Sequence, residues 1–211
     1  MLMDLRQLMP KYGLTFKGVL HIGANVGEEA PVYNQLRIIN QIWIEANPEI
    51  FPKLCENLSK YNRQTVVALN YCIGDENRDA VLHISNNEGQ SSSVLELGTH
   101  KDAHPEVKYI KDIPVKMQRV DSIPGINALL QDCDFLNIDL QGFELNALRG
   151  MGNLLNRFKA AYLEVNQKEL YKGCALVDSI DSFMITNNFR RVETKWWSES
   201  AGWGDALYIK R

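Results

Sequence analysis

The sequence has little that marks a secreted, membrane-bound or nucleic-acid-binding protein. Its four cysteines are scattered and form no C-x-x-C pair, which argues against a disulfide framework. It has no secretory signal and no apolar run near the roughly 20 residues of a membrane-spanning helix. Lysine and arginine number 23 against 26 acids, and they form no basic block. We therefore expect a cytoplasmic protein with free thiols that binds neither nucleic acid nor membrane.

Apolar residues, in contrast, are sufficient for one substantial core. They make up 45% of the 211 residues, so we expect a single domain over residues 1–211. Leucines at helical spacing predict a short helix within residues 1–17, and this helix is expected to pack on the rest of the domain.

The segment around which the chain is organised covers residues 18–27 and reads GVLHIGANVG. Its apolar, β-branched first half predicts a buried parallel strand. A glycine-rich turn follows and leads into a helix predicted over residues 28–40, an arrangement that brings backbone N–H groups close to a ligand. The same glycines also suit a plain strand-to-helix turn, so this segment alone does not establish a site.

The second predicted strand, residues 41–45, ends in an acid. In a doubly wound sheet, Glu45 at this position lies beside the glycine turn of the first strand and can accept hydrogen bonds from both hydroxyls of a ribose. Asn47 is the expected N-cap of a helix over residues 47–61. The glycine turn and the acid together predict a nucleoside-binding site.

The glycine turn does not match a dinucleotide site. The pattern G-x-G-x-x-G lacks its middle glycine here, because Ala24 and Asn25 stand inside G-A-N-V-G. Glu28 and Glu29 follow at the start of the helix, where they would repel a pyrophosphate. A cationic sulfonium with an amino-acid tail is the better fit to such a turn.

With these segments the chain resembles the FkbM-type S-adenosylmethionine-dependent methyltransferases. The resemblance rests on HIGANVGEE, WIEANPE, NYCIGDE and FLNIDLQGFELNALRG, which occur in the family's order from about residue 19 onward. It implies S-adenosylmethionine as the cofactor and an α/β, Rossmann-like class I methyltransferase fold. We expect a mostly parallel seven-stranded sheet with an antiparallel last strand, helices on both faces and a small β insertion after the third core strand.

The resemblance also implies which residues bind the cofactor. The third predicted strand covers residues 65–72, and its end is expected beside the adenine. His21 departs from the acid that much of the family has at this position, and a neutral imidazole removes one negative charge facing the cofactor. The expected cofactor-binding residues are His21, Gly23, Ala24, Asn25, Gly27, Glu45, Ala46, Cys72, Ile73 and Asp139.

The candidate catalytic residues are Asp139 and Glu144, in a segment that reads D-x-E-G-x-E in the family. Gln141 departs from that pattern and cannot take a proton, which excludes a base at this position. Asp139 follows a predicted strand, at the edge where open α/β sheets bind ligands. For Glu144, a second role is equally consistent with the sequence: its negative charge in the first turn of a helix can stabilise the helix dipole. Glu164 lies in the next predicted strand. Its side chain either lines the cleft or makes a structural hydrogen bond, and the sequence does not decide between the two.

Residues 79–120 are predicted to form an insertion of two strands around a polar loop. We consider this loop either a lid over the substrate or a solvated segment. Within it, His100 and His104 have the i, i+4 spacing of metal ligands on a helix. Gly98 and Pro105 flank the pair and no third ligand is evident, so we expect no bound metal.

Two closing strands complete the expected fold. Trp197 and Trp203 near their turn either line an acceptor pocket or pack against the edge of the sheet. The further expected elements are strands over residues 80–85, 113–120, 135–139, 160–165, 191–197 and 206–210, and helices over residues 121–131, 143–158 and 176–188.

The resemblance suggests O-methylation of a hydroxyl on a small-molecule acceptor, a sugar or a natural product. Two alternatives stay open. One is an oxidoreductase that binds NAD(P) or another nucleotide, although the chain has no clear Tyr-x-x-x-Lys pair. The other is a non-catalytic cofactor-binding module, in which Asp139 and Glu144 would be replaceable. The sequence does not indicate the acceptor or the oligomeric state.

Overall fold

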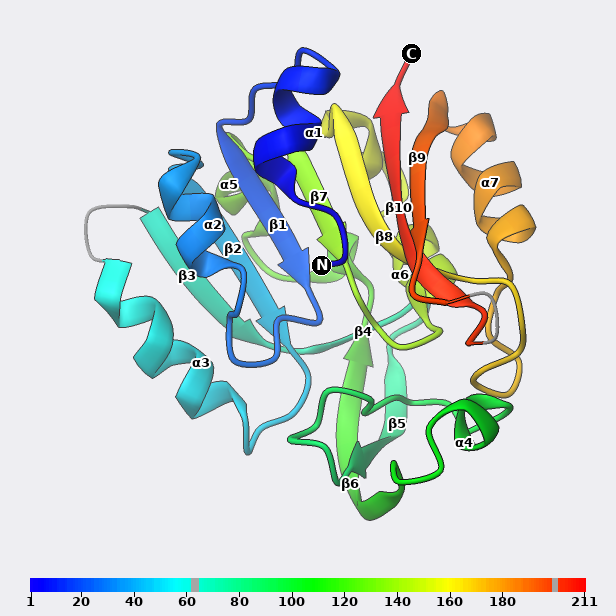
Figure 1. Cartoon of the computed structure of the whole chain (residues 1–211). Helices are drawn as coiled ribbons and strands as arrows, with labels where there is room; N and C mark the ends of the chain where they lie inside the picture. The colour runs from blue at the N-terminus through cyan, green and yellow to red at the C-terminus, as the bar shows by residue number, and fades with distance from the viewer. Residues whose placement is uncertain (62–64, 199–200) are drawn as a thin grey trace.

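The computed structural model describes residues 1–61, 65–198 and 201–211. A central sheet has seven strands, and all of them run parallel except the last, β10, which is antiparallel to both neighbours (Figure 1). The expected seven-stranded sheet with an antiparallel last strand is therefore confirmed. Along the sheet, the strands are β3 (Thr65–Asn70), β2 (Asn40–Glu45), β1 (Gly18–Ile22), β7 (Phe135–Ile138), β8 (Ala160–Asn166), β10 (Trp203–Lys210) and β9 (Phe189–Trp196).

Helices cover both faces of this sheet. One face packs against α1 (Leu5–Lys11), α2 (Ala30–Gln35) and α3 (Phe51–Leu58), around a core that includes Trp43 and Phe135. The other face packs against α5 (Ile126–Leu129), α6 (Glu144–Gly150) and α7 (Val177–Thr186). Within the described ranges, none of the helices has the length and apolar character needed to cross a bilayer.

A second, smaller sheet lies at the carboxyl ends of the core strands. It consists of β4 (Cys72–Ile73), β6 (Tyr109–Gln118) and β5 (Arg78–Ser85), in that order, with β5 and β6 antiparallel. The short helix α4 (His100–Ala103) belongs to the segment between β5 and β6. Figure 1 shows this inserted region at the bottom of the view, where the arrowheads of β1, β2 and β7 point. The expected β insertion after the third core strand is present.

Several expected element boundaries were wrong. The helix after β2 begins at Phe51 rather than at Asn47, and residues 48–50 form turns, although the Asn47 side chain accepts a hydrogen bond from the Glu49 backbone N–H as an N-cap does. The third core strand ends at Asn70, and Cys72 belongs to β4, which pairs with β6.

Two expected long helices are each divided. The segment 143–158 forms α6 and then the 3₁₀-helix η3 (Gly152–Arg157), with Gly152 at φ +51° at the division. The segment 121–131 forms η2 (Val120–Ser122) and α5, separated by Gly125 at φ +75°. A further 3₁₀-helix, η1 (Ser59–Tyr61), extends α3. These divisions leave the layers of the fold unchanged.

Candidate active site

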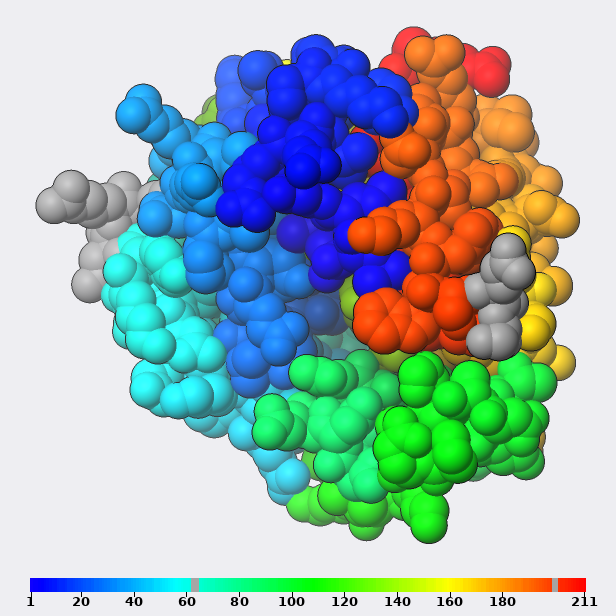
Figure 2. All heavy atoms as spheres, viewed as in Figure 1, coloured from blue at the N-terminus to red at the C-terminus, as the bar shows by residue number. Residues whose placement is uncertain are grey.

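A cavity of about 520 Å³ opens at the carboxyl ends of β1, β2, β7 and β8. Its other walls come from residues 87–94 of the insertion, from the first two residues of the chain and from the closing hairpin. Figure 2 shows a recess where the blue N-terminal, green inserted and orange C-terminal segments meet. This is the sheet edge at which open α/β folds bind ligands.

The glycine turn forms the floor of the cavity. The backbone N–H groups of Gly23 and Ala24 donate to the Ile44 carbonyl, at 2.9 and 3.0 Å, which ties the turn to β2. Gly23 has φ +84°, and a Cβ atom added to it would lie 1.7 Å from the Asp139 carbonyl oxygen. Only glycine allows the backbones after β1 and β7 to approach this closely. Gly27, at φ +79°, packs against Leu54 and does not line the cavity.

We expect Gly23→Ala to lower the free energy of unfolding by about 2–4 kcal/mol, because it combines a steric clash with an unfavourable φ. Gly13→Ala is a matched control, since Gly13 has φ +64° but no atom within 4 Å of an added Cβ. It should lower the free energy of unfolding by only about 1–2 kcal/mol. Chemical denaturation of both variants measures the difference, and equal effects would mean that the close approach to Asp139 contributes nothing.

Glu45 lies at the end of β2 and is 8% exposed. Its Oε2 accepts a hydrogen bond from the Asn25 backbone N–H at 2.8 Å, and its Oε1 accepts one from the Asn47 backbone N–H at 2.6 Å. Burial raises the pKa of this carboxyl, and hydrogen bonds from the backbone N–H groups of Asn47, Asn25 and Ala46 oppose that rise. The acid therefore fixes the glycine turn, and the carboxylate keeps capacity for a further donor.

Negative charge dominates the cavity wall. Among its described lining residues there is no lysine or arginine, the side chains that commonly pair with phosphate groups, and the Met1 ammonium that also lines it is paired with Glu29 Oε1 at 3.3 Å. The wall thus suits a cation such as a sulfonium or an ammonium group, and the residues present fit S-adenosylmethionine. The acids that line it are Glu28, Glu29, Glu45, Glu106, Asp139, Glu164 and Asp205.

His21 lines the cavity at one side of β1, but its ring packs into the protein. The ring stacks on Trp43 at 4.7 Å between centroids, and Nδ1 lies 3.2 Å from the Tyr33 hydroxyl oxygen. Burial lowers the pKa of this imidazole, because the charged form loses its hydration. This shift favours the neutral imidazole, which supplies no charge at the position where much of the family has an acid.

Asp139 and Glu164 come together across neighbouring strands. Asp139 follows β7 and is exposed, whereas Glu164 lies in β8 and is 3% exposed. The Gln141 side-chain N–H₂ group donates to both, at 2.6 Å to Asp139 Oδ1 and 2.6 Å to Glu164 Oε2. The Tyr171 hydroxyl donates to Gln141 Oε1 at 2.6 Å. Glu164 thus faces the cavity, one of the two orientations that the sequence left open.

Glu144 occupies a different place from Asp139. It is fully buried and does not line the cavity, and its Oε1 accepts hydrogen bonds from the backbone N–H groups of Leu140 and Gly142, at 2.8 and 3.1 Å. Burial raises the pKa of this carboxyl to about 7, with a further contribution from the negative charge of Asp139. The pKa of Glu164 is raised well above its usual range, first by burial and then by Asp139 and Glu144.

These raised pKa values predict how stability depends on pH. The Glu144 carboxyl binds its proton more tightly in the native state, at a pKa of about 7, than in the unfolded chain, where the usual value is 4.5. The free energy of unfolding therefore falls as the pH rises between these two values, and this contribution levels off above them. Glu144→Gln keeps an oxygen for both backbone donors and should reduce the slope.

Chemical denaturation at several pH values, in the presence of a chelator, measures the effect of Glu144→Gln. Asp132→Asn is the control, because Asp132 is exposed and lies outside the cavity. An unchanged slope in Glu144→Gln would contradict the assignment of a raised pKa to this carboxyl.

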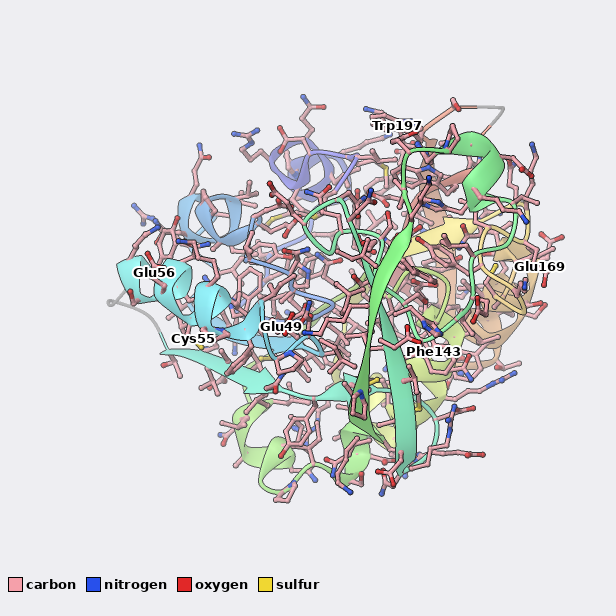
Figure 3. All side chains as sticks on the ribbon, turned by 90° about the horizontal axis from the view of Figure 1, so that it is seen from below. Glu49, Cys55, Glu56, Phe143, Glu169 and Trp197 are labelled. Atoms are coloured by element: carbon pink, nitrogen blue, oxygen red, sulfur yellow. The ribbon has the colours of Figure 1, made fainter. Side chains whose placement is uncertain are left out.

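The remaining expected cofactor residues, Ala46, Cys72 and Ile73, line the cavity beside Phe143. Burial raises the pKa of the Cys72 thiol to about 12, so it is a neutral, apolar part of the wall. Figure 3, seen from below, shows the inserted strands lying across this end of the sheet, with Phe143 beside them and Trp197 near α4. The apolar wall formed by Ala46, Cys72, Ile73 and Phe143 suits a flat ring such as adenine.

The histidine pair of the insertion also borders the cavity. His100 begins α4 and His104 follows its end, with ring centroids 5.1 Å apart. Within residues 1–61, 65–198 and 201–211, the one group of three acids, histidines or cysteines with metal-ligand spacing lies elsewhere, at Asp139, Glu144 and Glu164. The insertion therefore contributes to the cavity wall; whether it acts as a lid stays a prediction.

Sequence reasoning did not identify Tyr171, Phe143 or Ser93 as cavity residues. Ser93 Oγ donates to the Gln141 carbonyl at 2.9 Å and connects the insertion to the turn after β7. Tyr171 lies in the segment that follows β8, and all segments that follow parallel strands emerge at one edge of the sheet. That rule could have placed Tyr171 near the site, whereas the position of Ser93 depends on an insertion with no periodic pattern.

The fold is that of the class I S-adenosylmethionine-dependent methyltransferases, and the acidic cavity fits their cofactor. Solved structures support the fold. The magnesium protoporphyrin IX methyltransferase of Synechocystis PCC 6803 with bound S-adenosylmethionine has a TM-score of 0.57 at 11% identity, covering 98% of this chain and 76% of that one. A putative tRNA (m1A22) methyltransferase of Streptococcus pneumoniae, in complex with S-adenosylmethionine, has a TM-score of 0.53 at 9% identity, covering 100% and 73%.

The sequence comparisons identify the family. Residues 21–191 match the methyltransferase FkbM domain, so the chain belongs to the FkbM methyltransferase family. It is also 28% identical over 184 residues to the 2-O-methyltransferase NoeI of Sinorhizobium fredii (strain NBRC 101917 / NGR234), covering 82% of this chain and 74% of that protein. The chain is an S-adenosylmethionine-dependent methyltransferase, and the alternatives of an NAD(P)-binding oxidoreductase and a non-catalytic module receive no support.

Proposed function

We propose that this protein transfers a methyl group from S-adenosylmethionine to a hydroxyl of a sugar or a sugar-like natural product. The observation that carries the proposal is the similarity to the 2-O-methyltransferase NoeI along 82% of the chain. The paired rings of Trp197 and Trp203 support it, because they line the cavity and stack with centroids 5.4 Å apart. Such rings offer an apolar face to the C–H groups of a sugar.

Each expected residue then has a proposed role. Gly23, Ala24 and Asn25 form the turn under the methionine and ribose portions, and Glu45 accepts hydrogen bonds from the ribose hydroxyls. Cys72 and Ile73, with Ala46, form the adenine wall. Gly27 and His21 support the turn from behind, through their packing against Leu54 and Trp43.

Asp139 is proposed as the base. When bound, the sulfonium supplies an electrophilic methyl carbon, whose bond to sulfur breaks as the bond to the acceptor oxygen forms. The protein has to hold the two reactants in line and accept the hydroxyl proton. Asp139 is the exposed carboxylate at the cavity floor, so its free oxygen can take that proton. Glu144 acts through the turn that it holds, by its hydrogen bonds to Leu140 and Gly142.

Two measurements test this function in turn. Calorimetric titration with S-adenosylmethionine, S-adenosylhomocysteine and NADH should show binding of the two adenosyl compounds and none of NADH. Transfer of a labelled methyl group from S-adenosylmethionine should then occur to free sugars or oligosaccharides with hydroxyls, and not to the same compounds with those hydroxyls already methylated. Labelling of the protected compounds, or of amines instead, would overturn the proposed acceptor class.

A further inference from the structure

Three carboxylates from three elements converge at the floor of the cavity. Asp139 follows β7, Glu144 begins α6 and Glu164 lies in β8. Each offers an oxygen, and these oxygens all lie within 4.8 Å of one another. Asp139 and Glu164 line the cavity, so the cluster is open to a ligand on that side.

No ion pair of the described residues balances the charge of this cluster; the Met1 ammonium, which pairs with Glu29, acts on Asp139 through its charge alone. Glu144 is 0% and Glu164 is 3% exposed, and no ion pair among the described residues includes any of the three acids. The one side chain that bridges the cluster is the neutral amide of Gln141. Buried carboxylates are costly unless a proton or a cation compensates them.

Two buried polar groups beside the cluster have hydrogen-bonding capacity that no described residue uses. Glu144 Oε1 accepts two backbone hydrogen bonds, but Glu144 Oε2 has no partner. Asn166 lies two residues after Glu164 on β8, hence on the same face of that strand, and neither amide atom has a partner. Because most buried polar atoms in proteins are hydrogen-bonded, the orphaned Glu144 Oε2, which belongs to the cluster itself, indicates a further ligand there.

We propose that Asp139, Glu144 and Glu164 bind a divalent cation of the Mg²⁺ or Mn²⁺ type beside the methyl acceptor. Such ions prefer carboxylate and amide oxygens. Opposite oxygens lie about 4.2 Å apart across Mg²⁺ and about 5 Å apart across Ca²⁺, so the separation of up to 4.8 Å needs little adjustment. Rotation of the Gln141 amide by half a turn replaces its N–H₂ donor with an oxygen ligand, and its nitrogen can then donate to Tyr171.

The role of the cation rests on the methyltransferase function proposed above. An acceptor hydroxyl that coordinates the cation has a lower pKa, so its proton leaves more readily to water or to the Asp139 oxygen that does not bind the cation. The cation also holds the acceptor oxygen beside the cofactor cavity. The spacing of the three acids along the sequence did not reveal this site. It is separate from the His100 and His104 pair, which the sequence analysis considered for metal binding.

Mn²⁺ binding tests the proposal without an acceptor. Chelator-treated protein with S-adenosylhomocysteine is titrated with Mn²⁺, and free Mn²⁺ is measured by electron paramagnetic resonance. We expect one saturable site per chain. Glu164→Gln and Glu144→Gln should each weaken it about 10- to 100-fold. Glu28→Gln, which removes an acid from the same cavity outside the cluster, and His100→Ala should bind Mn²⁺ within about twofold of the unmodified chain.

The outcomes separate the cation from the methyl-transfer function. Absence of saturable binding, or equal losses in Glu28→Gln, overturns the cation site; in that case the acids hold protons instead. Calorimetry with S-adenosylhomocysteine in chelator measures cofactor binding independently, and its failure overturns the proposed function but not the cation site. Thermal unfolding of each variant identifies a folding defect, and Asp139→Asn, at an exposed residue, serves if Glu144→Gln does not fold.

Discussion

Asp139→Asn is expected to lower kcat for methyl transfer by about 10²- to 10⁴-fold, the range that a positioned general base contributes. Asparagine has nearly the same size and keeps an oxygen that can accept the Gln141 hydrogen bond, but it cannot take a proton. Because Asp139 is exposed and follows the strand rather than lying in it, the free energy of unfolding should change much less than the activity.

For the variant and the unmodified enzyme, we would measure kcat, the dissociation constant of S-adenosylhomocysteine and the melting temperature in the same preparation. The acceptor is a sugar that becomes labelled in the methyl-transfer assay described above. Asp79→Asn is the control, because Asp79 lies on β5 with a side chain that is 86% exposed and outside the cavity. It should keep the activity of the unmodified enzyme. Normal turnover in Asp139→Asn would exclude Asp139 as the base and make Glu164, the neighbouring carboxylate that also lines the cavity, the next candidate.

The sequence predicted those parts of the site that depend on local pattern. A buried strand that ends in glycines, followed by a second strand that ends in an acid, was sufficient to place Gly23 beside Glu45, because neighbouring parallel strands end at the same edge. The structure brings these segments together through the hydrogen bond from Asn25 N–H to the Glu45 carboxylate. The antiparallel last strand was likewise predictable from the family pattern.

What could not be predicted depends on backbone geometry over a few residues. After β7 the chain turns at Gln141 and Gly142, with φ +53° and φ +98°. This turn directs Asp139 into the cavity and Glu144 beneath the turn, although both acids belong to one motif. The sequence pattern makes Asp139 and Glu144 equally good catalytic candidates. Their burial distinguishes them, because Asp139 is exposed whereas Glu144 is buried and accepts hydrogen bonds from backbone N–H groups.

Strand register sets a second limit on what the sequence could tell. Glu164 faces the cavity because Ile138 at the end of β7 pairs with Leu163, so that the next position along β8 lies beside Asp139. A shift by one residue would direct Glu164 to the opposite face of the sheet. The three-carboxylate cluster depends on this register together with the turn after β7, which explains why a search for short metal-ligand spacings considered the histidines instead.

Glu45→Ala is expected to weaken binding of S-adenosylhomocysteine by about 1.5–3 kcal/mol, a rise of roughly 10- to 150-fold in Kd. The substitution removes the acceptor proposed for the ribose hydroxyls. It also removes the partner of the Asn25 and Asn47 backbone N–H groups, which fix the glycine turn and the start of the next segment.

Glu45→Gln distinguishes these two contributions. Glutamine keeps one oxygen, which can still accept a backbone hydrogen bond, but it loses the negative charge and the second acceptor. If the charged hydrogen bonds to the ribose dominate, Kd measured by calorimetry should rise nearly as much in Glu45→Gln as in Glu45→Ala. If the geometry of the turn dominates, Glu45→Gln should retain most of the affinity, and Glu45→Ala should also lower the melting temperature. Unchanged affinity in both variants would remove Glu45 from the cofactor site.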